Sequence, residues 1–144
     1  MSLCTVSTGN GVQSTALLVL AAQGEIDFRT FLFANVGDDS EHPATMRYFH
    51  EVAAPYAEAH GIEMVELRRT NKRGEPQTLL AKLKAGRMMI PVRRRAGGPP
   101  MSRSCTADFK VAVLAKELKR RGATKADPAT VALGISVDEI ERAK

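Results

Sequence analysis

The expected fold follows from residues 3–16, which read LCTVSTGNGVQSTA. Residues 3–6 are apolar or β-branched, as in a buried strand. Residues 7–13 follow, all of them small or polar except Val12, and an apolar helix then starts at about Ser14. Glycines let backbone N–H groups approach an anion, and a helix N-terminus favours negative charge. This strand-loop-helix therefore predicts a turn that holds phosphates.

Outward from this stretch, apolar segments of strand length alternate with helical periodicity, which predicts an α/β fold with a doubly wound, mostly parallel sheet. The expected strands are 3–6, 30–34, 62–67 and 130–135. The expected helices are about 14–23, 43–60, 76–85 and 107–121, and another helix starts at 137. Residues 1–144 are expected to form a single nucleotide-binding domain with a mobile loop at about 86–104.

Three details of the helices are predicted as well. The first helix is apolar on all sides and is expected to be buried. The second helix carries one apolar stripe, and Pro76 is expected to be the first residue of the third helix. The stripe consists of Phe49, Val52, Ala53 and Tyr56.

Composition limits the function classes. The content of 44% hydrophobic and 26% charged residues is typical of a globular protein. No apolar run approaches the roughly 18 residues of a membrane span, and no secretory signal is visible, so we expect a cytoplasmic protein without membrane contact. Two cysteines do not imply a disulfide framework. The net charge of +5 is gathered in basic clusters that suit a polyanion such as a nucleic acid, although a solvated surface is the alternative for any one cluster.

The first candidate site is the loop after the first strand. Its glycines, hydroxyls and helix N-terminus suit a phosphate, and the alternative is a plain tight turn with Ser14 as the helix N-cap. The residues expected to contact a nucleotide there are Ser7, Thr8, Gly9, Asn10, Gly11, Gln13, Ser14 and Thr15.

The second candidate site follows the second strand, where Asp38, Asp39, Glu41 and His42 are candidates to hold Mg²⁺ or contact a ribose. The alternative is that each of them is a solvated or helix-capping residue. Because ligands of open parallel sheets sit at the carboxyl ends of the strands, this loop and the first are expected to share one crevice.

Two further sites lie later in the chain. At the start of the fourth helix, Arg103 and the helix N-terminus favour a reactive thiol, which makes Cys105 a candidate nucleophile or ligand; the alternative is Thr106 as a cap and Cys105 as a packed residue. After the last strand, Ser136 is expected to cap a helix with Glu139 in the capping-box position.

The order of these sites resembles a known family. Residues Ser7 to Ser14 resemble the PP-loop of the N-type ATP pyrophosphatases, and residues 33–37 with Pro43 and Thr45 resemble the second-strand motif of the phosphoadenosine phosphosulfate (PAPS) reductase-like branch. Two later motifs of that branch are resembled by Arg103, Cys105 and Lys110, and by Gly134, Ser136, Asp138, Glu139 and Arg142.

This resemblance implies an adenine-nucleotide α-hydrolase-like fold that binds ATP or a PAPS-type nucleotide, with Mg²⁺ as a candidate ion. It implies catalytic roles for Ser14, Arg103, Cys105 and Lys110. It extends nucleotide binding to Ala34, Asn35, Gly37, Gly134, Ser136, Asp138, Glu139 and Arg142.

The chain also departs from the family pattern. Gln13 stands where the PP-loop usually has an aspartate, and Asn10 where it usually has a glycine. Cys105 follows Ser104 rather than a second cysteine, so two cysteines in all cannot supply a four-cysteine iron–sulfur cluster on one chain. The family's C-terminal part with its nucleophilic cysteine has no counterpart within nine residues after Ile135.

The favoured interpretation is an ATP pyrophosphatase-type enzyme that adenylates a small molecule or a nucleic acid. Three alternatives stay open: a sulfonucleotide reductase, a truncated relative that binds nucleotide without turnover, and a basic nucleic-acid-binding protein whose α/β fold is incidental. The acceptor and the oligomeric state are not determined by the sequence.

Overall fold

The computed structural model describes residues 3–87, 90–93, 95, 97–99, 102 and 104–143, without the side chains of residues 140, 142 and 143. Its centre is a sheet of four parallel strands in the order β3-β2-β1-β4. The strands are β1 (Cys4–Thr8), β2 (Thr30–Asn35), β3 (Glu63–Arg68) and β4 (Thr130–Leu133). The α/β fold with a parallel sheet is confirmed, and each strand lies within two residues of its predicted bounds.

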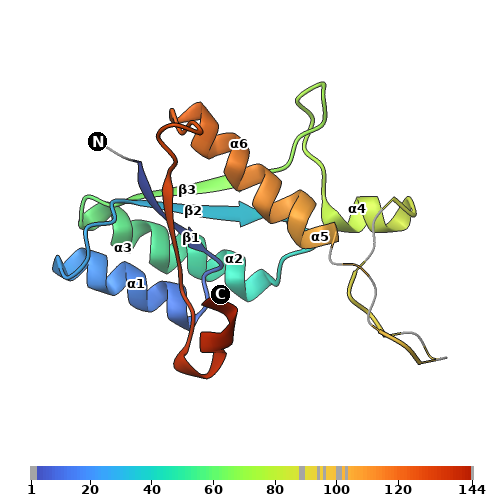
Figure 1. The fold of residues 1–144 in the computed structure, drawn as a ribbon, viewed down its shortest axis with the longest axis horizontal. Helices are drawn as coiled ribbons and strands as arrows, with labels where there is room; N and C mark the ends of the chain where they lie inside the picture. Colours follow the sequence, from blue (N-terminus) through green and yellow to red (C-terminus); the bar gives the residue numbers. More distant parts are fainter. Residues whose placement is uncertain are drawn as a thin grey trace.

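Helices cover both faces of the sheet (Figure 1). One face carries α1 (Val12–Gln23) and a long helix made of α2 (Pro43–Tyr48), the π-helical turn η1 (Phe49–Ala53) and α3 (Ala54–Ala59). The other face carries α6 (Ala112–Arg120), which contacts β2 and β3. The core between the sheet and the first group consists of Val6, Leu18, Ala21, Phe31, Ala53, Ala57 and Ile62.

The prediction that the first helix is buried is wrong. Only Ser14, Leu18 and Ala21 of α1 are buried, whereas Val12 is 83% exposed and Leu20 is 37% exposed. A helix on the outer layer of a sheet buries one stripe, and these three residues recur at the helical period. The apolar residues on the opposite side of α1 therefore face solvent.

The predicted helix 43–60 is present, but the π-helical turn changes its phase. Pro55 has no N–H to bond the carbonyl four residues earlier, and the wide turn ends just before it at Ala53. Phe49 and Ala53 are buried as expected. Val52, assigned to the same stripe by the sequence, is 50% exposed.

Two predicted helix starts are wrong. Pro76 is not a first helical residue, because α4 (Leu79–Lys84) begins after Thr78, whose hydroxyl accepts a hydrogen bond from the Ala81 amide at 3.2 Å. The last long helix begins at α5 (Ser104–Thr106) and continues through η2 (Ala107–Val111) into α6, so Thr106 has helical dihedral angles and is not a cap.

The final segment is a short 3₁₀ helix, η3 (Val137–Ala143). Seven residues of the predicted mobile loop at 86–104 lie outside the described ranges, and among those that are described only Ser104, the first residue of α5, belongs to a helix or strand. None of the helices in the described ranges has the length and apolar character needed to cross a bilayer.

Candidate nucleotide site

The chain reverses its direction across the sheet at β1. It runs from β1 to β2 and β3 on one side, and returns to place β4 on the other side. Ligands of doubly wound sheets bind at such a switch point, beyond the carboxyl ends of the strands. A cavity of about 260 Å³ lies there, which we call the β1–β4 crevice. Its lining consists of Ser7, Gly9, Gly11, Gln13, Ser14, Leu133, Gly134 and Ile135.

The first turn of α1 faces this crevice. Gly11 is the N-cap and forms no side-chain cap hydrogen bond, and the Ser14 hydroxyl donates back to the Gly11 carbonyl at 3.1 Å. The first amides of a helix have no partner within the helix, and the aligned peptide dipoles place partial positive charge at that end. Ser14 is thus held within the first turn and does not act as the N-cap that the alternative interpretation assigned to it.

Gly134 presses the end of β4 against the start of α1. A Cβ atom at position 134 would lie 2.7 Å from the Ser14 amide nitrogen and 2.8 Å from the Gln13 carbonyl carbon. Both neighbours are backbone atoms, so neither can rotate away. Only glycine allows the end of β4 and the start of α1 to come this close. Two segments far apart in the sequence thereby form one crevice.

Asn10 takes the left-handed conformation in the loop, with φ of 55°. Glycine adopts this conformation without strain, and asparagine tolerates it better than most residues. The departure from the family's glycine at this position is therefore compatible with the loop geometry. The side-chain Oδ1 of Asn10 accepts a hydrogen bond from the Thr8 hydroxyl at 3.4 Å. The side-chain Nδ2 of Asn10 is buried and has no partner among the described residues.

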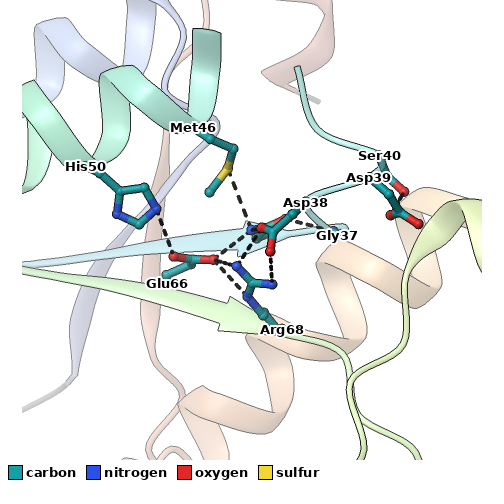
Figure 2. Close-up of polar contacts among 9 residues, drawn as sticks. Gly37, Asp38, Asp39, Ser40, Met46, His50, Glu66 and Arg68 are labelled. Atoms are coloured by element: carbon teal, nitrogen blue, oxygen red, sulfur yellow. Dashed lines mark hydrogen bonds and ion pairs between the residues drawn. The ribbon is translucent and has the colours of Figure 1, made fainter. Parts of the chain in front are cut away.

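At the other half of the rim, polar side chains are bonded to one another (Figure 2). Asn35 is 1% exposed, accepts the Gly37 amide at 2.7 Å and donates to Glu66 Oε1 at 2.7 Å and Asp38 Oδ1 at 3.2 Å. Arg68 makes a bidentate pair with Asp38 at 2.8 and 2.7 Å and also donates to Glu66. We call these four residues, Asn35, Asp38, Glu66 and Arg68, the β2–β3 network.

Within the network, the charged side chains are paired with one another: Arg68 bonds to both Asp38 and Glu66. Hydrogen bonds from Arg68 and then Asn35 hold the pKa of Asp38 below its usual value, and the bond to Asp38 raises the pKa of Arg68. The ring of His50 lies 3.7 Å from Glu66 and Met46 Sδ lies 3.6 Å from the Asn35 amide. Asn35, which is predicted to bind nucleotide, forms its hydrogen bonds with Gly37 and Asp38 of the loop after β2 and with Glu66.

The remaining acids of the strand-two loop have structural partners too. Asp39 accepts hydrogen bonds from Ser40 at 2.8 Å and from Thr78 at 3.0 Å. His42 Nδ1 accepts the Ala44 amide at 3.2 Å and so caps α2. Within the described residues, no group of three or more His, Cys, Asp or Glu side chains is placed to hold a metal ion. Gly37 is buried with φ of 125°, so it shapes this loop.

Of the two later motifs, one has a residue in the lining of the β1–β4 crevice and the other has none. Gly134 lines the crevice, and Ser136, Asp138 and Glu139 follow it at the start of η3. Cys105 is half-buried in α5, and Lys110 is exposed in η2; α5 lies near the carboxyl end of β2 in Figure 1. No hydrogen bond or ion pair among the described residues joins either of them to the first loop. Arg103 and the side chain of Arg142 lie outside the described residues.

Sequence reasoning missed Glu66 and Arg68, the two network members on β3. Alternation along a strand could have found them, because positions 64, 66 and 68 share one face and two of the three are charged. It also missed Leu133, which is 60% exposed at the crevice.

The comparisons with known proteins add no relative: no protein-family model, curated protein or solved structure matches this chain.

Proposed function

We propose that the chain binds the phosphates of a nucleotide in the β1–β4 crevice and transfers an adenylyl group from ATP to an acceptor. The observation that carries the proposal is the placement of a glycine-rich loop and an uncapped helix N-terminus at the switch point of a parallel sheet. The choice of adenine and of adenylating chemistry rests on the resemblance to the PP-loop family.

The crevice suits phosphate oxygens in particular. Its polar groups are backbone amides, the Gln13 side-chain amide and the hydroxyls of Ser7 and Ser14, all of them uncharged; the Ser14 hydroxyl would have to turn from the Gly11 carbonyl to donate to a phosphate. The unpartnered amide of Asn10 is a further donor in the same loop, which a small loop shift would bring to an acceptor. The lining contains no carboxylate that would repel an anion.

In the proposed reaction an acceptor nucleophile attacks the α-phosphorus of ATP. The bond between the α-phosphorus and the bridging oxygen breaks, and pyrophosphate leaves with the electron pair. Catalysis then consists of orienting the phosphates and stabilising the charge on the departing pyrophosphate, which the α1 amides and Ser14 supply. Mg²⁺, if it takes part, would be held by the phosphates and water, because the crevice lining offers it no carboxylate.

Calorimetric titration with ATP and with PAPS, each with Mg²⁺, tests the binding step. Gly9→Val tests the site, because no atom lies within 4 Å of a Cβ at position 9, so the added side chain fills the crevice without straining the free protein. We expect this variant to weaken nucleotide binding at least about 10-fold, or roughly 1.4 kcal/mol. Ala59→Val, at an exposed position of α3, is the matched control and should bind as the parent does.

Product analysis separates the chemistries. Release of AMP and pyrophosphate from ATP supports adenylation, thiol-dependent sulfite release from PAPS supports the reductase alternative, and binding without either product supports a non-catalytic nucleotide-binding role. Absence of binding of both nucleotides to the folded parent contradicts the proposal, as does equal weakening by Gly9→Val and Ala59→Val.

A further inference from the structure

The charges of this chain are strongly segregated along the sequence. Residues 1–67 contain nine Asp or Glu and two Lys or Arg, whereas residues 69–110 contain eleven Lys or Arg and two acids. The net charge of +5 is therefore the small difference between an acidic part and a strongly basic part. Such asymmetry is typical of proteins that hold a polyanion on one side.

The loop between β3 and α4 presents two of these cations at its tip. It is closed by an antiparallel bridge between Thr70 and Pro76, and the Asn71 side chain accepts the amides of residues 73 and 75 at 2.8 and 3.0 Å. The Asn71 amide also donates to the Glu75 carboxylate at 2.6 Å. This acid is thereby held by Asn71, while Lys72 and Arg73 remain exposed.

The helix α4 continues the same basic surface. Lys82 and Lys84 lie in its last turn, and the Arg87 amide donates to the Lys82 carbonyl at 3.1 Å. A hollow of about 270 Å³ is lined by Asn71 of the loop together with Lys82 and Arg87. Loop and helix therefore form one basic loop–helix surface, which comprises Lys72, Arg73, Lys82, Lys84 and Arg87.

These five cations differ in their partners from Arg68, Arg69 and Arg121. Arg68 pairs with Asp38 at 2.7 Å, Arg69 lies 3.6 Å from Asp108, and Arg121 pairs with Glu63 at 2.6 Å. Within the described part of the chain, none of the five residues of the basic loop–helix surface takes part in an ion pair. Their charge is available to a partner.

We propose that the basic loop–helix surface binds the phosphate backbone of a nucleic acid. Residues 57–108 contain no Phe, Tyr or Trp, so the surface lacks the rings on which bases stack and should bind without sequence preference. A lipid surface fits less well, because Val92 is the one large apolar side chain exposed in the described part of residues 69–110. An acidic protein would match the charge as well, and competition with polyglutamate separates it from a nucleic acid.

The segments that carry this surface, the β3–α4 loop and α4, lie to the right in Figure 1, past the carboxyl ends of β2 and β3, whereas β1 and β4 lie nearer the middle. Binding of a nucleic acid here requires only the positive charge and the exposed position of these side chains, whether or not the crevice takes a nucleotide. Nucleic-acid binding and nucleotide binding are accordingly measured in separate titrations.

Fluorescence anisotropy with labelled single-stranded RNA, single-stranded DNA and duplex DNA of about 20 nucleotides tests the proposal. We expect affinity to fall with salt, with a slope of log Kobs against log[salt] of about −3 for a single strand held by four or five phosphate contacts. The double variant Lys84→Glu, Arg87→Glu should bind at least about 10-fold more weakly at about 100 mM salt and reduce the slope by about 1.

Lys119→Glu, Lys125→Glu changes the net charge equally at the far end of α6 and in the loop after it, where both residues are exposed. This control should change the affinity by less than about 2-fold, because it lies beyond the screening length at this salt concentration. Circular dichroism and thermal unfolding of both variants check that the fold is retained.

Four outcomes overturn the proposal. They are no binding by the parent at low salt, equal loss in both double variants, displacement of the nucleic acid by ATP, and equally tight binding of polyglutamate or anionic vesicles. The third would place the contact in the crevice, and the fourth would assign the surface to another class of partner.

Discussion

At the carboxyl ends of β2 and β3, the side chains of Asn35, Asp38, Glu66 and Arg68 bond to one another, whereas at the ends of β1 and β4 the loop amides face an open crevice. A second ion network holds the opposite end of β3, where Arg121 joins Glu117 and Glu63. The β2–β3 half of the sheet thus uses its polar groups for stability. At the β1–β4 half, by contrast, the first turn of α1 lines a crevice and Gly11 gives it no side-chain cap.

This contrast predicts which changes reduce stability and which reduce binding. Changes in the networks should lower the free energy of unfolding and leave nucleotide affinity intact. Changes at the crevice should do the reverse, or affect both by smaller amounts.

The largest effect on stability is expected from Asn35→Ala. It leaves the Gly37 amide and a Glu66 oxygen without their buried partner, which should cost about 3 kcal/mol of unfolding free energy. Urea unfolding measures this loss. Asn71→Ala, which removes as many hydrogen bonds from a surface loop, should cost less than about 1 kcal/mol. Equal losses would show that burial of the network does not matter.

The second effect concerns acid stability. Hydrogen bonds from Arg120 and then Arg121 lower the pKa of Glu117 to about 2 in the folded chain, from an ordinary value near 4.5. Its contribution to stability is therefore complete above pH 4.5 and is lost as the pH falls toward 2. Glu117→Gln should cost about 2 kcal/mol at pH 7, allowing for the exposure of Arg120, and flatten the pH dependence of unfolding between those values.

Glu58→Gln is the control for that experiment, since Glu58 is exposed and has no ion pair among the described residues. Its unfolding should follow the pH profile of the parent. A profile of Glu117→Gln that matches the parent would contradict the role assigned to the second network.

A smaller effect on stability is expected from Gly134→Ala, because the new methyl group meets backbone atoms of α1. The segments must move apart to make room for this methyl group, which should lower the free energy of unfolding by about 1.5 kcal/mol. The shift of the loop should also weaken nucleotide binding. Gly9→Ala is the counterpart on the same crevice, where a methyl group meets nothing; its stability should stay within about 0.5 kcal/mol of the parent. If both variants unfold alike, β4 does not press on α1 as described.

The smallest effect is expected at Asn10. Asn10→Ala places a residue with a Cβ and no local hydrogen bond in the left-handed conformation, which should cost about 1 kcal/mol. Asn10→Gly should cost only a few tenths of a kcal/mol, because glycine adopts this conformation freely but gains entropy when unfolded. Thermal unfolding of the pair measures the difference, and a larger cost for glycine would mean that the Asn10 side chain stabilises the loop.

Much of the fold was predictable from local patterns. The alternation of short apolar runs with helical periodicity gave an α/β sheet, because strand and helix periods differ and show within a few residues. The first helix ends at Gln23, as its predicted bounds give, and Gly24 follows it in the left-handed conformation with φ of 80°. Local patterns could not show that α1 exposes Val12, that Val52 points outward within a π-helical turn, or that α4 starts at Leu79, since these depend on contacts between elements.

The candidate site divides in the same way. The sequence by itself determined the strand-loop-helix at Ser7 to Ser14 and the excess of cations in residues 69–110, since both are properties of consecutive residues. The tertiary structure decided that Gly134 packs against the start of α1 at the crevice and that Asn35 bonds to the loop after β2 and to Glu66 on β3. The reason is physical: the close approach of Gly134 to the start of α1 and the hydrogen bond between Asn35 and Glu66 exist only after residues 120 and 31 positions apart have been brought together.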